Sequence, residues 1–203
     1  MQFKITSVIN NECYYKEKAM PPKQEITRKD MLEAAIRGLR RNDGKLSVRN
    51  IAKECNCSTQ PIYREFGSME ALQSAVLSVC AEIYQNIVKE WMQSGKYPLY
   101  KCFGMAYISF AVQEKALFRY VYMRDRRSED VSDDRKNNAE VLQILMDSLR
   151  IDEDEAYRLH IEMWIFVHGI ATLLAGNYLD VSEAQISAML TDAYDALFAK
   201  YKR

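Results

Sequence analysis

Side chains suited to nucleic-acid contact gather between residues 45 and 68. Arg64 could pair with guanine and Gln60 with adenine, while the Tyr63 hydroxyl could donate to a phosphate. Lysine, arginine and serine side chains nearby could bind further phosphates by charge or at helix N-termini. The candidate DNA contacts are Lys45, Ser47, Arg49, Ser58, Thr59, Gln60, Tyr63, Arg64 and Ser68, and Lys53 adds non-specific attraction. The alternative interpretation is an ordinary solvated helix face.

Short helices with recognisable ends are expected to position these side chains. Thr27-x-x-Asp30 resembles a capping box and begins the first helix. Gly44 follows that helix and suits a left-handed C-cap. Ser47 is expected to cap the second helix and Ser58 the third.

The third helix separates a polar face from an apolar one. Pro61 falls in its first turn, where the missing N–H breaks no intrahelical bond. Ile62 and Phe66 lie one turn apart and should point to the core. Gly67 stops this helix, and Ser68 caps a fourth one that runs to about residue 92. Two short helices joined by a tight turn predict a helix-turn-helix, whose second helix can enter the DNA major groove.

The rest of the chain has helical periodicity and no strand pattern of any length. After a turn at 95–98, helices are predicted up to about residue 114, then at 116–123, 134–148, 152–178 and from 182, with a charged loop at 124–136. We therefore expect an all-α protein with three parts. These are a flexible N-terminal tail (1–24), a three-helix helix-turn-helix DNA-binding domain (25–72), and a larger helical ligand-binding and dimerisation domain (73–203).

The composition allows a sizeable core and indicates the cellular compartment in which we expect the protein. Hydrophobic residues make up 48% and the net charge is zero, although residues 21–75 hold ten Lys and Arg against seven Asp and Glu. The start of the chain lacks the apolar region of a signal peptide. The longest apolar run, residues 163–176, is shorter than the roughly 20 residues that span a bilayer. Five cysteines form no even disulfide framework, so we expect a reduced, cytoplasmic protein without a membrane partner.

The patterns typical of enzymes are missing from the sequence. It has no glycine-rich phosphate loop, nucleophile elbow or metal-binding His pair. Cys55-x-Cys57 raises a metal or redox alternative, but the two histidines, His160 and His168, lie in another region. A small buried side chain before the third helix explains Cys57. We expect no enzymatic activity, no metal and no cofactor.

Residues 26–76 resemble the DNA-binding segment of the TetR family of transcriptional regulators. The matching features are Gly44, Ile51-Ala52, Ser58, Tyr63-Arg64-Glu65-Phe66 and Met69-Glu70-Ala71-Leu72. The family usually has a phosphate-binding lysine where this chain has Met69, so we expect a weaker phosphate grip. The resemblance implies a homodimer that binds a near-palindromic DNA operator, usually as a repressor. It also implies release when a small molecule binds the C-terminal domain.

The segment around Trp164 and His168-Gly169 resembles a ligand-binding subgroup of the same family. Aromatic side chains with His168 as a polar handle could line an apolar pocket. The alternatives are a plain aromatic core and a histidine satisfied by a backbone carbonyl. The candidate ligand contacts are Phe103, Tyr107, Phe110, Phe118, Tyr122, Trp164 and His168, which favour a small apolar or aromatic effector. The resemblance further implies dimerisation through the eighth and ninth helices (152–178 and from 182).

A second function remains compatible with the sequence. The chain could be a helical ligand-binding or protein-interaction module whose helix-turn-helix does not read DNA. Sequence-selective DNA binding with a steep salt dependence would distinguish the two.

Overall fold

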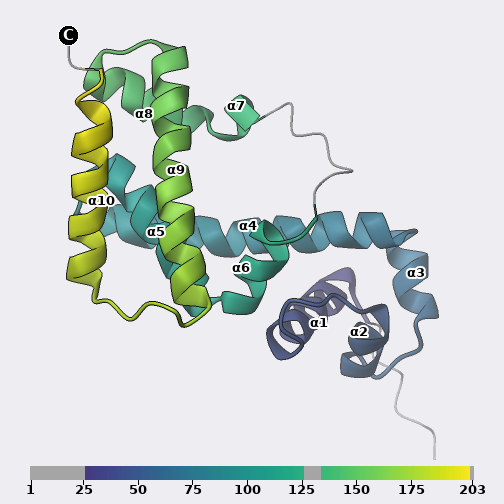
Figure 1. Cartoon of the computed structure of the whole chain (residues 1–203). Coiled ribbons are helices and arrows are strands. Elements are labelled where there is room, and N and C mark those ends of the chain that lie inside the picture. The colour runs from purple at the N-terminus through teal and green to yellow at the C-terminus, as the bar shows by residue number, and fades with distance from the viewer. Residues whose placement is uncertain (1–25, 126–133, 202–203) are drawn as a thin grey trace, which may run out of the picture.

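The computed structural model describes residues 26–125 and 134–201, and the regular structure in those ranges is helical throughout (Figure 1). A small head holds α1 (Arg28–Arg41), α2 (Val48–Glu54) and α3 (Gln60–Phe66). The helix α4 (Met69–Gln93) runs from this head into the body. The body holds α5 (Leu99–Gln113), α6 (Lys115–Tyr122), α7 (Asp134–Asn137), α8 (Ala139–Leu149), α9 (Glu153–Ala175) and α10 (Glu183–Phe198). The predicted all-α fold is confirmed; the proposed tail and most of the charged loop lie outside the described residues.

Side chains cap several helix starts that the sequence indicated. Thr27 and Asp30 form the capping box of α1. The Ser47 hydroxyl accepts from the Asn50 N–H, and the Ser68 hydroxyl accepts from the Ala71 N–H at 3.1 Å. Because these bonds satisfy N–H groups that a helix leaves unpaired, they fix where α1, α2 and α4 begin.

The predicted Ser58 cap of the third helix is wrong. Thr59 occupies the N-cap of α3, and its side chain makes no capping hydrogen bond. The backbone of Thr59 already has helical angles, with φ −72° and ψ −18°. A capping side chain reaches back from an extended residue such as Thr27, which has φ −82° and ψ 161°. Pro61 lies in the first turn and removes one of the N–H groups that a cap would satisfy.

Two predicted helix boundaries are also wrong. The segment 134–148 is not one helix, because the Asn138 N–H bonds to the Arg135 carbonyl three residues back and separates α7 from α8. The eighth predicted helix ends at Ala175 rather than 178. Asn177 there takes a left-handed conformation (φ 59°), and the Tyr178 N–H bonds back to the Leu173 carbonyl.

One apolar core joins the head to the body. Buried residues of α1, including Leu39, belong to the same cluster as Phe110 and Phe118 of the body. In the body, α5 packs against both α4 and α9. A second cluster around Leu145 and Leu159 holds α8 on α9. In the described ranges, no helix combines the length and apolar content needed to cross a membrane.

Candidate functional site

The side chains proposed to read bases lie on the outer face of α3. Gln60, Tyr63 and Arg64 are exposed, whereas Ile62 and Phe66 on the other face are buried in the head. Tyr63 keeps 49% of its surface exposed, although it is a large aromatic residue. The sequence predicted this division of α3 correctly, and it leaves a polar surface with an aromatic hydroxyl available to a partner.

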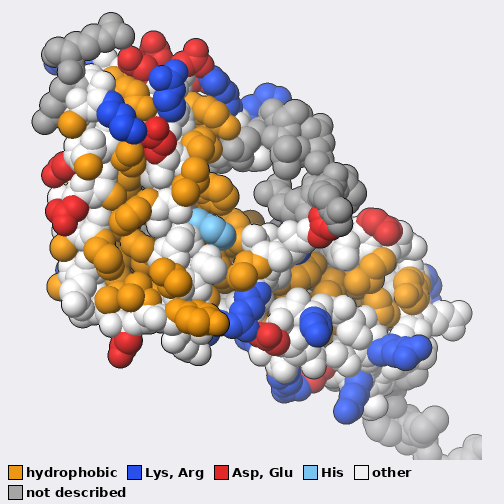
Figure 2. Space-filling view, in the orientation of Figure 1, with side chains coloured by type: hydrophobic (Ala, Val, Ile, Leu, Met, Phe, Trp, Pro, Cys, Tyr) orange, Lys and Arg blue, Asp and Glu red, His pale blue; other side chains and the backbone are white. Residues whose placement is uncertain are grey.

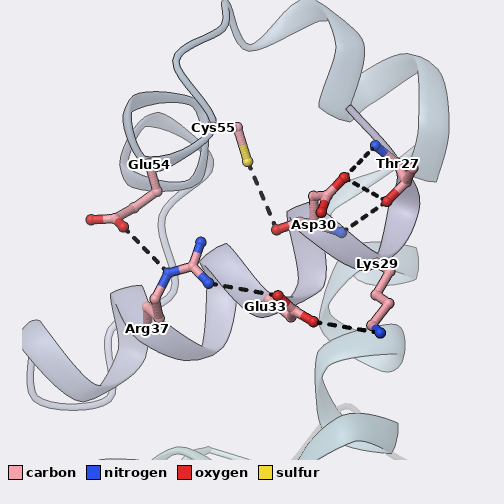
Figure 3. Close-up of polar contacts among 7 residues, drawn as sticks. All are labelled: Thr27, Lys29, Asp30, Glu33, Arg37, Glu54 and Cys55. Carbon is pink, nitrogen blue, oxygen red and sulfur yellow. Dashed lines mark hydrogen bonds and ion pairs between the residues drawn. The ribbon is translucent and has the colours of Figure 1, made fainter. Parts of the chain in front are cut away.

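The basic side chains of the head fall into two groups. Those of α1 form ion pairs with carboxylates of the chain at the surface: Arg37 contacts Glu33 and Glu54, Arg41 contacts Glu54, and Arg28 contacts Glu65 (Figure 3 shows the Arg37 contacts). A second group is exposed and forms no ion pair with any described residue: Lys45, Arg49, Lys53 and Arg64. The positive charge available to an external anion therefore lies on α2, α3 and the turn before α2.

The serine and threonine candidates for DNA contact divide into helix caps and residues that cap no helix. Ser47 and Ser68 are occupied as helix caps, which places the N-termini of α2 and α4 rather than free hydroxyls at the surface. Ser58 is exposed and Thr59 is half-buried. Met69, at the position where a lysine was expected, packs partly buried against the core. The N-terminus of α4 consequently offers backbone N–H groups without an added side-chain charge.

Most candidate ligand contacts come together in one ring cluster. Tyr107 and Phe110 of α5, Phe118 and Tyr122 of α6, and His168 of α9 lie with ring centroids 4.8–6.5 Å apart. Trp164 stacks on His168 at 5.3 Å. The Tyr107 hydroxyl lies 2.9 Å from His168 Nδ1. The partner of His168 Nδ1 is therefore a tyrosine hydroxyl and not a backbone carbonyl.

Three residues differ from the sequence-based expectation for this cluster. Phe103 lies one turn before Tyr107 but makes no ring contact with these residues in the described structure. Tyr84 of α4 was missed, although it packs edge-on against Tyr107 and Phe110. Its four-residue spacing from the buried Cys80 was the available signal. A Cβ on Gly169 would meet nothing within 4 Å, so no helix in the described part of the chain approaches that glycine closely.

Burial governs the protonation of the cluster. Desolvation lowers the pKa of His168 below its usual 6.5, which favours the neutral imidazole. Desolvation also raises the pKa of the Tyr107 phenol, with smaller contributions from Tyr122 and Tyr84 and an opposing one from Trp164. The Tyr107 hydroxyl thus keeps its proton and can donate it to Nδ1 of neutral His168.

Acid should weaken this cluster. The unfolded chain binds a proton on His168 near pH 6.5, whereas the folded chain binds it only at lower pH. We therefore expect the His168 contribution to stability to be complete above pH 6.5 and to be lost as the pH falls below it. Thermal melts of wild type and His168→Gln across this range should show a smaller acid-induced decrease for the variant. Parallel curves would contradict a buried neutral His168.

A cleft of about 590 Å³ marks the junction of head and body, with residues of α1, α6 and the end of α9 in its lining. Arg40 of α1 forms two hydrogen bonds with Glu114, at 2.6 and 2.9 Å, which raise the pKa of the arginine. Arg119 of α6 pairs with Asp43 and donates to the Ala175 carbonyl at 3.2 Å. These charges already have partners, so the cleft is better described as a joint than as a binding pocket.

The backbone reinforces this joint at Gly44. Its φ of +80° suits glycine, as the sequence predicted, and its N–H bonds back to the Leu39 carbonyl of α1. A Cβ added there would lie only 2.7 Å from the Ala116 carbonyl oxygen of α6. The turn after α1 therefore touches the backbone of α6 directly.

The cysteine pair does not assemble a metal centre. Within the described residues, no group of three His, Cys, Asp or Glu side chains is placed to hold a metal ion. The Cys55 thiol lies against the Asp30 carbonyl, and burial raises the pKa of this thiol. A thiol is less reactive than a thiolate, so Cys55 and Cys57 are best explained as small side chains of the turn.

Comparison with known proteins agrees with this architecture of a helix-turn-helix head on a helical body. Residues 101–197 match the family described as "Tetracyclin repressor-like, C-terminal domain". A TetR-like transcriptional regulator from Rhodococcus sp. RHA1 has a similar fold, with a TM-score of 0.57 and 18% identity over 84% of this chain and 94% of that one. No curated protein matches the sequence significantly. The C-terminal half of the chain thus matches a TetR-type domain family, and the whole chain has the fold of a TetR-like regulator.

Proposed function

We propose that the protein is a homodimeric repressor that reads a near-palindromic DNA operator with α3 and releases it when a small apolar or aromatic effector binds the ring cluster. The main observation that supports DNA binding is the division of the basic side chains in the head into two groups. Arginines of α1 form ion pairs with carboxylates of the chain, whereas Lys45, Arg49, Lys53 and Arg64 are exposed on α2, α3 and the turn before α2 and form no ion pair with a described residue. Exposed cations can bind DNA phosphates, and the polar side chains of α3 can reach base edges in a groove.

Selection from random-sequence DNA tests this proposal. We expect the purified protein to enrich a motif with two related half-sites, because a two-fold dimer places its recognition helices about one or more helical turns apart. Failure to enrich any motif over several rounds would contradict it and favour the protein-interaction alternative.

A second copy of the chain is expected to cover the outer face of α9 and α10. Ile165, Phe166 and Leu173 of α9 are large apolar side chains that remain exposed, and apolar side chains gather over these two helices in Figure 2. Gly169 lies among them with open space above it. Such a contiguous apolar patch, with room for close helix approach, is typical of an oligomer interface.

A charge on this face should therefore separate the two protomers. Ile165 is 61% exposed, so Ile165→Asp should leave the monomer folded while placing an unpaired charge in the interface. We expect dimer dissociation to become at least about 100-fold easier, from roughly 3 kcal/mol of lost association. Sedimentation of wild type and variant measures this. Leu99→Asp, at a 53% exposed position of α5, is the matched control, and equal dissociation of both variants would contradict the assignment.

Two helices connect the ring cluster to the head. Tyr84 of α4 and Phe118 of α6 both contact Tyr107. The same α4 begins at the head, and α6 meets the head through Arg119 and Ala116. An effector that separates these rings could thus move both α4 and α6. It acts only through a difference in its affinity for the two arrangements.

The partly exposed Trp164 is a better probe of this coupling than Phe118. Phe118 is fully buried, and its replacement by Ala would destabilise the core by about 3–5 kcal/mol whatever the ligand does. Trp164 keeps 39% of its surface exposed. Its substitution can change effector binding with a smaller effect on folding.

A further inference from the structure

The ring cluster offers two hydrogen-bonding groups that no described residue uses. Nδ1 of His168 is occupied by the Tyr107 hydroxyl, but Nε2 has no partner among the described residues. The Tyr84 hydroxyl likewise makes no hydrogen bond within the described structure, although its ring packs against Tyr107 and Phe110. A ligand that reached this cluster could satisfy one of these groups.

Among the described residues, no charged side chain contributes to the pKa shifts of these groups. Desolvation is the only cause of the lowered pKa of His168. The pKa of the Tyr84 phenol is raised by desolvation and then by Tyr122, and no acidic or basic side chain contributes. For Tyr107 the contributing neighbours are again Tyr122, Tyr84 and Trp164. A charged ligand would therefore be desolvated here without a counter-charge.

Most rings of the cluster are buried, and Trp164 is partly exposed at its edge. Phe110 and Phe118 are 1% and 0% exposed. Several ring pairs meet edge to face, so their faces are already covered by ring edges. Trp164 is the exposed member and stacks only on His168 among the ring contacts. Movement of its indole away from His168 would vacate space of about one bicyclic ring.

We infer that the cluster accepts an uncharged mono- or bicyclic aromatic effector, which packs on the buried rings as Trp164 moves aside and hydrogen-bonds to His168 Nε2 or the Tyr84 hydroxyl. This inference rests on the proposed function, because it names the effector class of the same site. Anionic and cationic aromatics of equal size are excluded by their desolvation.

Three bicyclic probes of similar size test the charge selectivity. Calorimetric titration at neutral pH would compare 2-naphthol, which is neutral, with 2-naphthoate and N-methylquinolinium. We expect 2-naphthol to bind at least about tenfold more tightly than either charged probe, which corresponds to roughly 1.4 kcal/mol. Equal or tighter binding of a charged probe would overturn the inference, as would the absence of 2-naphthol binding below about 1 mM.

Variants of the two hydrogen-bonding residues test the position of the ligand. We expect the double variant Tyr84→Phe/His168→Phe to bind 2-naphthol at least about fivefold more weakly, because the ligand hydroxyl loses its partners. Trp91→Phe is the control, since Trp91 bonds to Ser109 and stacks on Tyr97 away from the cluster. Undiminished binding by the double variant, with a near-native melting temperature, would overturn the inference. If the first pair does not fold, His168→Leu with Tyr84→Phe also removes both hydrogen-bonding groups and replaces it.

A DNA-binding assay on the same preparations separates this inference from the proposed function. Selective DNA binding without 2-naphthol binding would overturn the effector class alone. Binding of 2-naphthol with the expected selectivity, but without DNA binding, would support the effector class and contradict the proposed function.

Discussion

Replacing Gly44 by Ala should destabilise the protein by about 3 kcal/mol. A left-handed backbone costs a residue with a Cβ about 1–2 kcal/mol, and Gly44 has φ +80°. The new Cβ would also lie 2.7 Å from the Ala116 backbone oxygen, and such overpacking costs about 1–3 kcal/mol. For a domain of this size, we expect the melting temperature to fall by roughly 6–12 °C.

Alanine variants of two other glycines distinguish the backbone strain from the steric clash expected in Gly44→Ala. Gly67 has φ +76° but open space around its Cβ position, so Gly67→Ala should show only the backbone strain. Gly38 lies inside α1 with nothing close and no unusual φ, so Gly38→Ala should be neutral or stabilising by up to about 1 kcal/mol. If Gly44→Ala were no worse than Gly67→Ala, the close contact between the head and α6 would be contradicted.

Removing both proposed base contacts should abolish operator selectivity. Each bidentate side-chain pair with a base contributes about 1–3 kcal/mol of discrimination. We therefore expect Gln60→Ala/Arg64→Ala to bind its operator roughly 10²–10⁴-fold more weakly. Binding to unrelated DNA should weaken much less, because only one positive charge is removed. Filter-binding or fluorescence-anisotropy titrations against both DNAs measure the two effects.

Arg41→Ala is the matched control for this double variant. Arg41 is also an exposed arginine of the head, but it is held by Glu54 on the α1 side. We expect its loss to change operator affinity by less than about threefold, in keeping with the small effect of a surface ion pair. An equal loss from Arg41→Ala and from the double variant would show that the α3 face is not the reading surface.

Local features of the head could be predicted from the sequence because local interactions determine them. Thr27 with Asp30, Ser47 and Ser68 mark helix starts through bonds that span only a few residues. Helical spacing identified Ile62 and Phe66 as buried. The cap of α3 failed because the backbone angles of Thr59, which the sequence does not reveal, decide whether a side chain can reach back.

Contacts between distant segments could not be predicted in the same way. Arg40 and Glu114 are 74 residues apart, and Arg119 and Asp43 are 76 apart, with no pattern to relate them. The aromatic residues of α5, α6 and α9 suggested a common region, but only tertiary packing excludes Phe103 and adds Tyr84. Capping residues and helical periodicity predicted the order of the helices, whereas the joint and the ring contacts depend on tertiary packing of this chain's own side chains.

A salt titration of DNA binding tests the central proposal most directly. It would compare wild type and Tyr63→Ala on the DNA immediately upstream of the protein's own gene and on a scrambled control. We predict that wild type binds the upstream DNA selectively, with an affinity that falls steeply as salt rises, and that Tyr63→Ala loses this binding. Equal weak binding to both DNAs at every salt concentration, or no binding even at low salt, would contradict a sequence-reading regulator.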